Sequence, residues 1–112
     1  MHELSITQNI VAIVDEAANG RRVLRVTLEV GELSGVVSDA IAFCFDIVAA
    51  GTALEGASLD IREIEGRARC ESCGSEFATS TLFATCPCGS HRLKLVQGEE
   101  LNVKSMELAE AA

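Results

Sequence analysis

The sequence predicts an α+β fold in which two helices cover one face of a small three-stranded sheet, with a cysteine-rich lobe inserted between two of the strands. Two segments repeat apolar residues with the 3.6-residue period of an amphipathic helix. Three other segments alternate apolar and polar residues, as half-buried strands do. Four of the five cysteines gather in two close pairs between the second and third predicted strands.

The first predicted element is a helix over residues 5–18. Ser5 is expected to cap its N-terminus, and Asn19-Gly20 is a typical signal for its end. The residues expected on its buried stripe are Ile6, Ile10, Ile13, Val14 and Ala17.

A strand is predicted over residues 23–33, followed by a second helix over residues 38–50. The strand is expected to bury Leu24, Val26, Leu28 and Val30, and the helix to bury Ile41, Phe45 and Val48. Cys44 lies within this helix between two phenylalanines, so we interpret it as a small core residue and not as a metal ligand.

The two remaining predicted strands cover residues 57–65 and 93–108, and Gly98-Glu99-Glu100 interrupts the second of them. The sequence therefore predicts an α/β domain made of residues 1–65 plus 93–112, and an inserted lobe over residues 66–92. The lobe is expected to have a small core of its own, formed by Phe77, Leu82 and Phe83.

The inserted lobe holds the two cysteine pairs, each followed directly by glycine. They are Cys70-Glu71-Ser72-Cys73-Gly74 and Cys86-Pro87-Cys88-Gly89. Two such turns can place four sulfurs in the tetrahedron of a structural zinc site, which predicts a zinc-ribbon lobe. His91 follows Cys88 by three residues, so a site of three sulfurs and His91 is the alternative. Two disulfides or free thiols are the remaining possibility.

Composition narrows the class of function. The formal net charge is −8 and the nine basic residues are scattered, which argues against nucleic-acid binding and favours protein partners or cation delivery. No apolar run approaches the ~20 residues needed to span a membrane. The start of the chain lacks the features of an export signal, so we expect a cytoplasmic protein. The sequence has no Gly-rich phosphate loop, so any nucleotide hydrolysis must come from a partner.

The first three residues, Met1-His2-Glu3, form a possible second metal site. The amine of Met1, the amide nitrogen of His2 and the His2 imidazole can chelate one ion, and Glu3 can complete the set. A nitrogen-rich square plane suits Ni(II) or Cu(II) better than zinc. Taken alone, however, a histidine at position 2 is most often an ordinary solvated residue.

Four features of the chain occur together: Met1-His2-Glu3, Val30-Gly31-Glu32-Leu33-Ser34, the two cysteine pairs, and Gly98-Glu99-Glu100-Leu101. In combination they resemble the HypA/HybF family of nickel-insertion accessory proteins for [NiFe]-hydrogenase maturation. The resemblance implies nickel at Met1, His2 and Glu3, and zinc at Cys70, Cys73, Cys86 and Cys88. In that family the second pair usually has two residues between its cysteines. Here Pro87 stands alone, which keeps His91 open as a fourth ligand.

The resemblance also implies partners and a function without enzymatic activity of its own. A metallochaperone of this family receives nickel from a hydrogenase-maturation GTPase and docks on the hydrogenase large-subunit precursor. Glu3 would contact the metal or a partner, or else favour the positive end of the first helix; Glu32 and Asp39 are expected to be solvated or capping groups. The competing hypotheses are a zinc-ribbon interaction module without nickel and a rubredoxin-like iron site for electron transfer.

Overall fold

The computed structural model describes residues 2–110 of the chain. Two helices and six strands follow one another in the described part of the chain. In order they are α1 (Glu3–Ala18), β1 (Val23–Gly31), α2 (Ser38–Ala49), β2 (Ser58–Ile64), β3 (Arg67–Cys70), β4 (Glu76–Ala78), β5 (Leu93–Gln97) and β6 (Leu101–Leu108).

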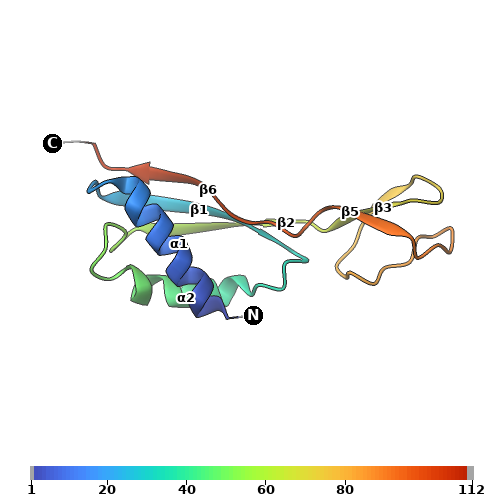
Figure 1. Cartoon of the computed structure of the whole chain (residues 1–112), viewed down its shortest axis with the longest axis horizontal. Helices are drawn as coiled ribbons and strands as arrows, with labels where there is room; N and C mark the ends of the chain where they lie inside the picture. The colour runs from blue at the N-terminus through green and yellow to red at the C-terminus, as the bar shows by residue number, and fades with distance from the viewer. Residues whose placement is uncertain (1, 111–112) are drawn as a thin grey trace. The chain divides into compact units, whose positions relative to one another are not determined.

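The strands form two three-stranded sheets, with the orders β2-β1-β6 and β4-β3-β5. Both helices lie on the same side of the first sheet (Figure 1). The predicted fold class is therefore confirmed: a three-stranded sheet with two helices on one face, and a separate lobe that carries the cysteines. Neither helix in residues 2–110 combines the length and the hydropathy that crossing a bilayer requires.

The chain divides into two compact units. The first comprises the chain up to Glu29, the segment Val37–Arg62, and the chain from Asn102 onward. The second comprises Val30–Val36 and Glu63–Leu101. This second unit is larger than the lobe of residues 66–92 expected from the sequence, because it also takes in β5 and the segment Val30–Val36, which begins with the last two residues of β1.

Helix α1 begins two residues earlier than predicted and buries a different stripe. Its N-cap is His2 and not Ser5, while Asn19 ends it in the left-handed conformation (φ 51°), as expected. The prediction that Ile13 and Ala17 are buried was wrong, since both are exposed. The residues that the helix does bury are Thr7, Ile10, Val11, Val14 and Ala18.

The core of the first unit lies between the sheet and the helices. Val26 and Leu28 of β1 and Ile41 and Phe45 of α2 are buried as predicted, and the loop residue Leu54 joins them. Leu24 was expected on the same face of β1, but 46% of its surface is exposed. A core of this kind, built mainly from aliphatic side chains, holds α1 and α2 on the sheet through burial of apolar surface.

The segment predicted as one strand over residues 93–108 consists of two strands in two different sheets. Strand β5 pairs antiparallel with β3, with Ala68 opposite Leu95 and Cys70 opposite Leu93. Strand β6 instead joins the β2-β1-β6 sheet. The interruption at Gly98-Glu99-Glu100 is thus the point at which the chain leaves one sheet for the other.

The second unit lacks the apolar core that the sequence predicted for it. Phe77 is half-buried, but Leu82 is 55% exposed and Phe83 is 90% exposed. The buried residues near the cysteines are instead Ala68, Thr79, and two of the cysteines themselves. Because a small lobe with so little apolar burial is marginal alone, a bound metal ion would supply much of its stability.

Three glycines allow the backbone segments of the second unit to approach closely. A Cβ atom at Gly31 would overlap the backbone of Gly98, and one at Gly66 would overlap the Thr79 carbonyl oxygen. Hydrogen bonds hold these segments together: the amide of Leu33 donates to the Gly98 carbonyl at 2.7 Å. The segment Val30–Val36 is therefore fixed to the cysteine-bearing unit by backbone contacts that only glycine permits.

Candidate metal centre

Four cysteine sulfurs meet in the second unit. The sulfurs of Cys70, Cys73, Cys86 and Cys88 all lie within 4.8 Å of one another. The distance from Cys73 Sγ to Cys86 Sγ is 3.6 Å, and that from Cys70 Sγ to Cys88 Sγ is 3.7 Å. Zinc–sulfur bonds of about 2.3 Å in a tetrahedron imply sulfur–sulfur edges of about 3.8 Å. The spacing therefore fits one tetrahedral metal ion of the size of zinc.

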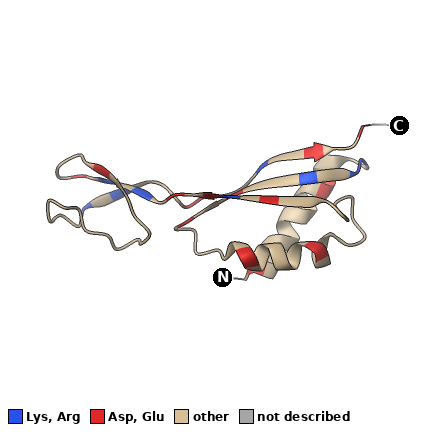
Figure 2. Ribbon diagram, turned by 180° about the vertical axis from the view of Figure 1, so that it is seen from behind, with Lys and Arg blue, Asp and Glu red and all other residues tan. Residues whose placement is uncertain are grey.

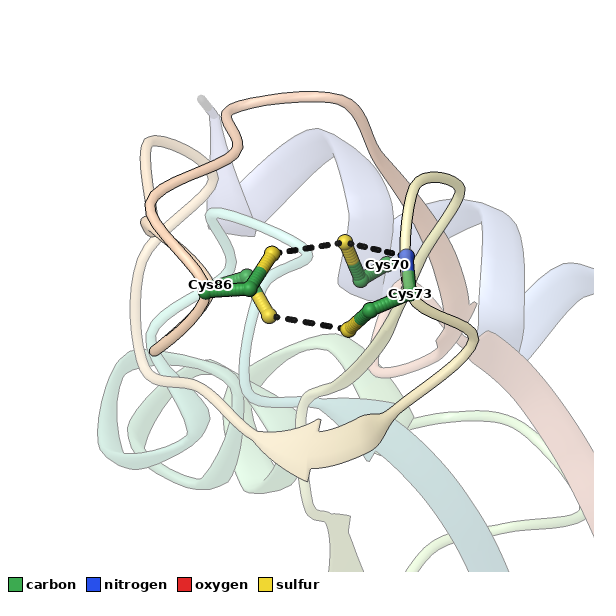
Figure 3. A group of neighbouring side chains, drawn as sticks. Cys70, Cys73 and Cys86 are labelled. Carbon is green, nitrogen blue, oxygen red and sulfur yellow. Dashed lines mark hydrogen bonds between the residues drawn. The ribbon is translucent and has the colours of Figure 1, made fainter.

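The side chains approach from two opposing turns. Figure 3 shows Cys70 and Cys73 on one turn, pointing toward Cys86 on the other. None of the five cysteines forms a disulfide, and the sulfur pairs at 3.6 and 3.7 Å lie well beyond a disulfide bond of about 2.05 Å. The fifth, Cys44, is half-buried in α2 and is not a member of the group, as predicted.

The first turn follows β3 and closes over five residues. The amide of Gly74 donates to the Cys70 carbonyl at 2.9 Å, and Gly74 takes the positive φ (81°) that such a turn needs. The amide of Cys73 also points at the sulfur of Cys70, at 3.4 Å. Amide donors of this kind stabilise a thiolate, which is the form that binds metal.

The second turn contains one residue fewer and closes one residue sooner. The amide of Gly89 donates to the Cys86 carbonyl at 2.8 Å, three residues back, and Gly89 again has a positive φ (93°). The shorter Cys86-Pro87-Cys88 spacing therefore still brings both sulfurs to the group. The second turn is thus one residue smaller than the first, and its two sulfurs still lie within the group.

Two polar links join the turns directly. The hydroxyls of Ser72 and Ser90 lie 3.0 Å apart, and the amide of Glu71 donates to the Arg92 carbonyl at 2.8 Å. These bonds fix the distance between the two cysteine pairs independently of any ion. The sulfur group is thus partly preorganised for metal binding.

The two buried cysteines hold their protons very differently. The amide of Cys73, pointing at the sulfur, lowers the pKa of Cys70 to about 6. The Cys88 amide favours the thiolate of Cys86, but burial and the neighbouring sulfurs outweigh it and raise the pKa of Cys86 to about 12. A metal ion would displace the remaining protons from the group, because thiolates and not thiols are the ligands.

His91 is not part of the sulfur group in the described chain. Its ring is exposed, and Nδ1 lies 3.1 Å from the hydroxyl of Thr85. The geometry thus favours four sulfurs over the alternative of three sulfurs and His91.

The second candidate site lies at the start of α1. Met1 falls outside the described residues. His2 is exposed and occupies the N-cap position, where its side chain makes no capping hydrogen bond. Its carbonyl accepts the first helical hydrogen bond, from the amide of Ile6 at 3.1 Å. An exposed imidazole at a helix start is accessible to a metal ion and to a second protein.

Glu3 makes a contact that the sequence did not predict. Its Oε2 accepts a hydrogen bond of 3.1 Å from the amide of Val37, which is the N-cap residue of α2. This bond lowers the pKa of Glu3 below the usual range for glutamate. The two residues are 34 positions apart, so no local pattern could have shown that Glu3 ties the start of α1 to the start of α2.

The other two carboxylates considered from the sequence lie apart from the sulfur group. Glu32 accepts a hydrogen bond from the amide of Gly66 at 2.9 Å, which gives it a structural role in the second unit. Asp39 is exposed in the first turn of α2.

Comparison with known proteins gives the family. Residues 1–108 match the profile of the family described as "HypA: Hydrogenase/urease nickel incorporation, metallochaperone, hypA". The chain belongs to the HypA family. The resemblance inferred from the motifs is confirmed, and the family's description is that of a nickel metallochaperone rather than of an enzyme.

Curated HypA relatives match over nearly their whole length. A hydrogenase maturation factor HypA from Nostoc sp. is 56% identical over 110 residues, covering 98% of this chain and 97% of the relative. That from Geobacter metallireducens is 54% identical over 109 residues, covering 96% of this chain and 99% of the relative.

Solved HypA structures share the fold. The solution structure of the Ni metallochaperone HypA from Helicobacter pylori superposes with a TM-score of 0.67 at 24% identity, covering 96% of this chain and 97% of that one. A second solution structure of a HypA protein gives a TM-score of 0.70 at 25% identity, covering 97% of each chain.

Proposed function

We propose that this HypA-family chain binds Ni(II) at its N-terminus and delivers it to the [NiFe]-hydrogenase large-subunit precursor. The observation that carries the proposal is the family match, which begins at residue 1 and so includes Met1-His2-Glu3. The nickel ligands are the amine of Met1, the amide nitrogen and imidazole of His2, and Glu3. A hydrogenase-maturation GTPase supplies the nickel, and the exchange takes place in the cytoplasm.

The start of α1 supports this nickel site. The first amides of a helix have no carbonyl partner one turn earlier, so the amides of His2 and Glu3 are free of helical hydrogen bonds. Deprotonated amides and an imidazole form the nitrogen-rich square that Ni(II) prefers. Since the Glu3 carboxylate accepts a hydrogen bond from the Val37 amide, the ligand that Glu3 supplies is its backbone nitrogen.

We propose that the four cysteines hold a zinc ion with a structural role. Tetrahedral sulfur coordination is typical of closed structural zinc sites, which retain no open position for chemistry. The ion would compensate for the small apolar core of the second unit. Its ligands are Cys70, Cys73, Cys86 and Cys88, with the hydrogen bonds at Cys70 and between the two turns as its support.

The alternative is a zinc-ribbon interaction module that carries no nickel. A nickel titration of the zinc-loaded protein separates the two, using the native N-terminus and a matched form with one glycine added before Met1. We expect tight binding of one nickel only with the native N-terminus, and loss of nickel but not zinc in His2→Ala. His91→Ala is the control and should keep both ions. Equal nickel affinity with and without the added glycine would exclude the amine as a ligand.

A further inference from the structure

Helix α2 exposes apolar side chains along one face. Phe43 is 76% exposed and Ile47, four residues later, is 67% exposed; Ala40, three residues before Phe43, is half-buried at the edge of the same face. We call these three residues the α2 stripe. The buried residues of the helix, Ile41 and Phe45, lie on its other side, against the core. Exposed phenylalanine and isoleucine side chains next to each other are typical of a surface that contacts another protein.

The surroundings of the stripe are acidic. Asp39 and Asp46 lie four residues before and three residues after Phe43, so both are its neighbours on the helix surface, and both are exposed. Neither α1 nor α2 contains a Lys or Arg, and Figure 2 shows red but no blue on the helices. Two copies of this face would bring like charges together. The charge pattern therefore favours a different protein, one with an apolar groove edged by Lys or Arg.

The stripe begins beside the N-terminal segment. The hydrogen bond from the Val37 amide to Glu3 Oε2 fixes the start of α2 next to the start of α1. Phe43 lies six residues further along α2, which corresponds to about 9 Å along a helix axis. A protein seated on the stripe would thus lie within reach of a metal ion at His2, which is where a nickel acceptor must be.

We propose that the α2 stripe is the docking surface for the nickel acceptor, the hydrogenase large-subunit precursor. This inference rests on the proposed function, because delivery cannot occur without an acceptor. The apolar centre provides affinity by burial, and the two aspartates orient a basic rim on the acceptor. The stripe itself contributes no nickel ligand.

The test compares binding of the metal-free full-length chain to the purified precursor by calorimetry. Phe43→Gln combined with Ile47→Gln removes the two exposed apolar side chains, and glutamine is a good helix former, so α2 should remain folded. We expect at least tenfold weaker binding of the precursor, and for Asp39→Asn with Asp46→Asn a smaller loss that disappears at high salt. Leu24→Thr, an exposed apolar residue on β1, is the matched control and should bind as the wild type does.

Circular dichroism and the nickel affinity of each variant establish that the fold and the N-terminal site are intact. Unchanged precursor binding in the folded double variant would overturn the proposal. So would loss of binding to the GTPase alone, or a dimer of the wild-type chain that the double variant dissociates. If the native chain failed to bind nickel, the proposed function would fail, while precursor binding by the metal-free chain would still decide whether the stripe is a docking surface.

Discussion

The fourth zinc ligand offers the sharpest test of the sulfur site. Replacing Cys88 with serine removes one corner of the group while leaving Pro87 and the following turn in place. A structural zinc ion in a small domain is worth about 10–16 kcal/mol at neutral pH, so one of four ligands contributes roughly 3 kcal/mol. That corresponds to about 100-fold in zinc affinity. The sulfur–sulfur distances of 3.6 and 3.7 Å are close to the edge of about 3.8 Å of a tetrahedral zinc site, so all four sulfurs are expected to share in binding.

The matched variant is His91→Ala, because His91 was the alternative fourth ligand. Its ring contacts Thr85 outside the sulfur group, so zinc affinity should stay within about twofold of the wild type. Competition with a chromophoric chelator at pH 7 measures both variants against the wild type. A larger loss of zinc in His91→Ala than in Cys88→Ser would refute the four-sulfur assignment.

Three further predictions follow from the contacts of single residues. In Gly66→Ala the new methyl overlaps the Thr79 carbonyl and the Leu33 side chain, so we expect the free energy of unfolding of the second unit to fall by about 1–3 kcal/mol in chemical denaturation. The control is Gly35→Ala, where no atom lies nearby and only the positive φ (78°) is unfavourable, so its free energy of unfolding should fall by about 1 kcal/mol. Equal losses in the two variants would contradict the clash at Gly66. The pKa of Glu3 is lowered in the folded state, so the hydrogen bond from Val37 to its carboxylate stabilises the fold above the ordinary glutamate pKa. This stabilisation is lost as the pH falls through the folded-state pKa, and Glu3→Gln should remove that part of the acid dependence of the melting temperature. An unchanged pH profile in the variant would show that the bond is absent in solution. Zinc affinity should fall as the pH is lowered, because protons compete with zinc for the thiolates. The fall should be steeper below about pH 6, where the Cys70 sulfur also takes up a proton. A zinc affinity that stays constant between pH 5 and 8 in competition with a chelator would contradict this.

The sequence was informative where the determining interactions are local. The spacing of the cysteines and the glycines after them predicted the sulfur group, because each turn is closed by bonds within five residues. Asn19 likewise marked the end of α1. Helix α1 was placed correctly, but its buried face was not: its many apolar residues include Ile13, and a nearly continuous apolar pattern does not show which of two adjacent stripes meets the sheet.

Interactions between residues far apart in the chain could not be predicted from local patterns in the sequence. Leu93, Leu95, Leu101 and Val103 share one apolar parity, which suggested a single strand, yet β5 and β6 pair in different sheets. The alternation of apolar residues does not show which strand is the partner. Phe83 was expected in a core of the lobe, yet it is 90% exposed. The bond between Glu3 and Val37 joins two elements that only tertiary packing brings together.

The glycine contacts bear on how the zinc-binding part of this protein can be isolated. A peptide cut at residues 66–92 would contain all four cysteines, but it would lack the amide of Leu33, the carbonyl of Gly98 and the carboxylate of Glu32 that caps the Gly66 amide. The zinc-binding unit is therefore compact in space but is built from two separate segments of the chain. An autonomous fragment must recruit Val30–Val36, more than thirty positions upstream of the first ligand, for instance by linking that segment covalently to residues 63–101.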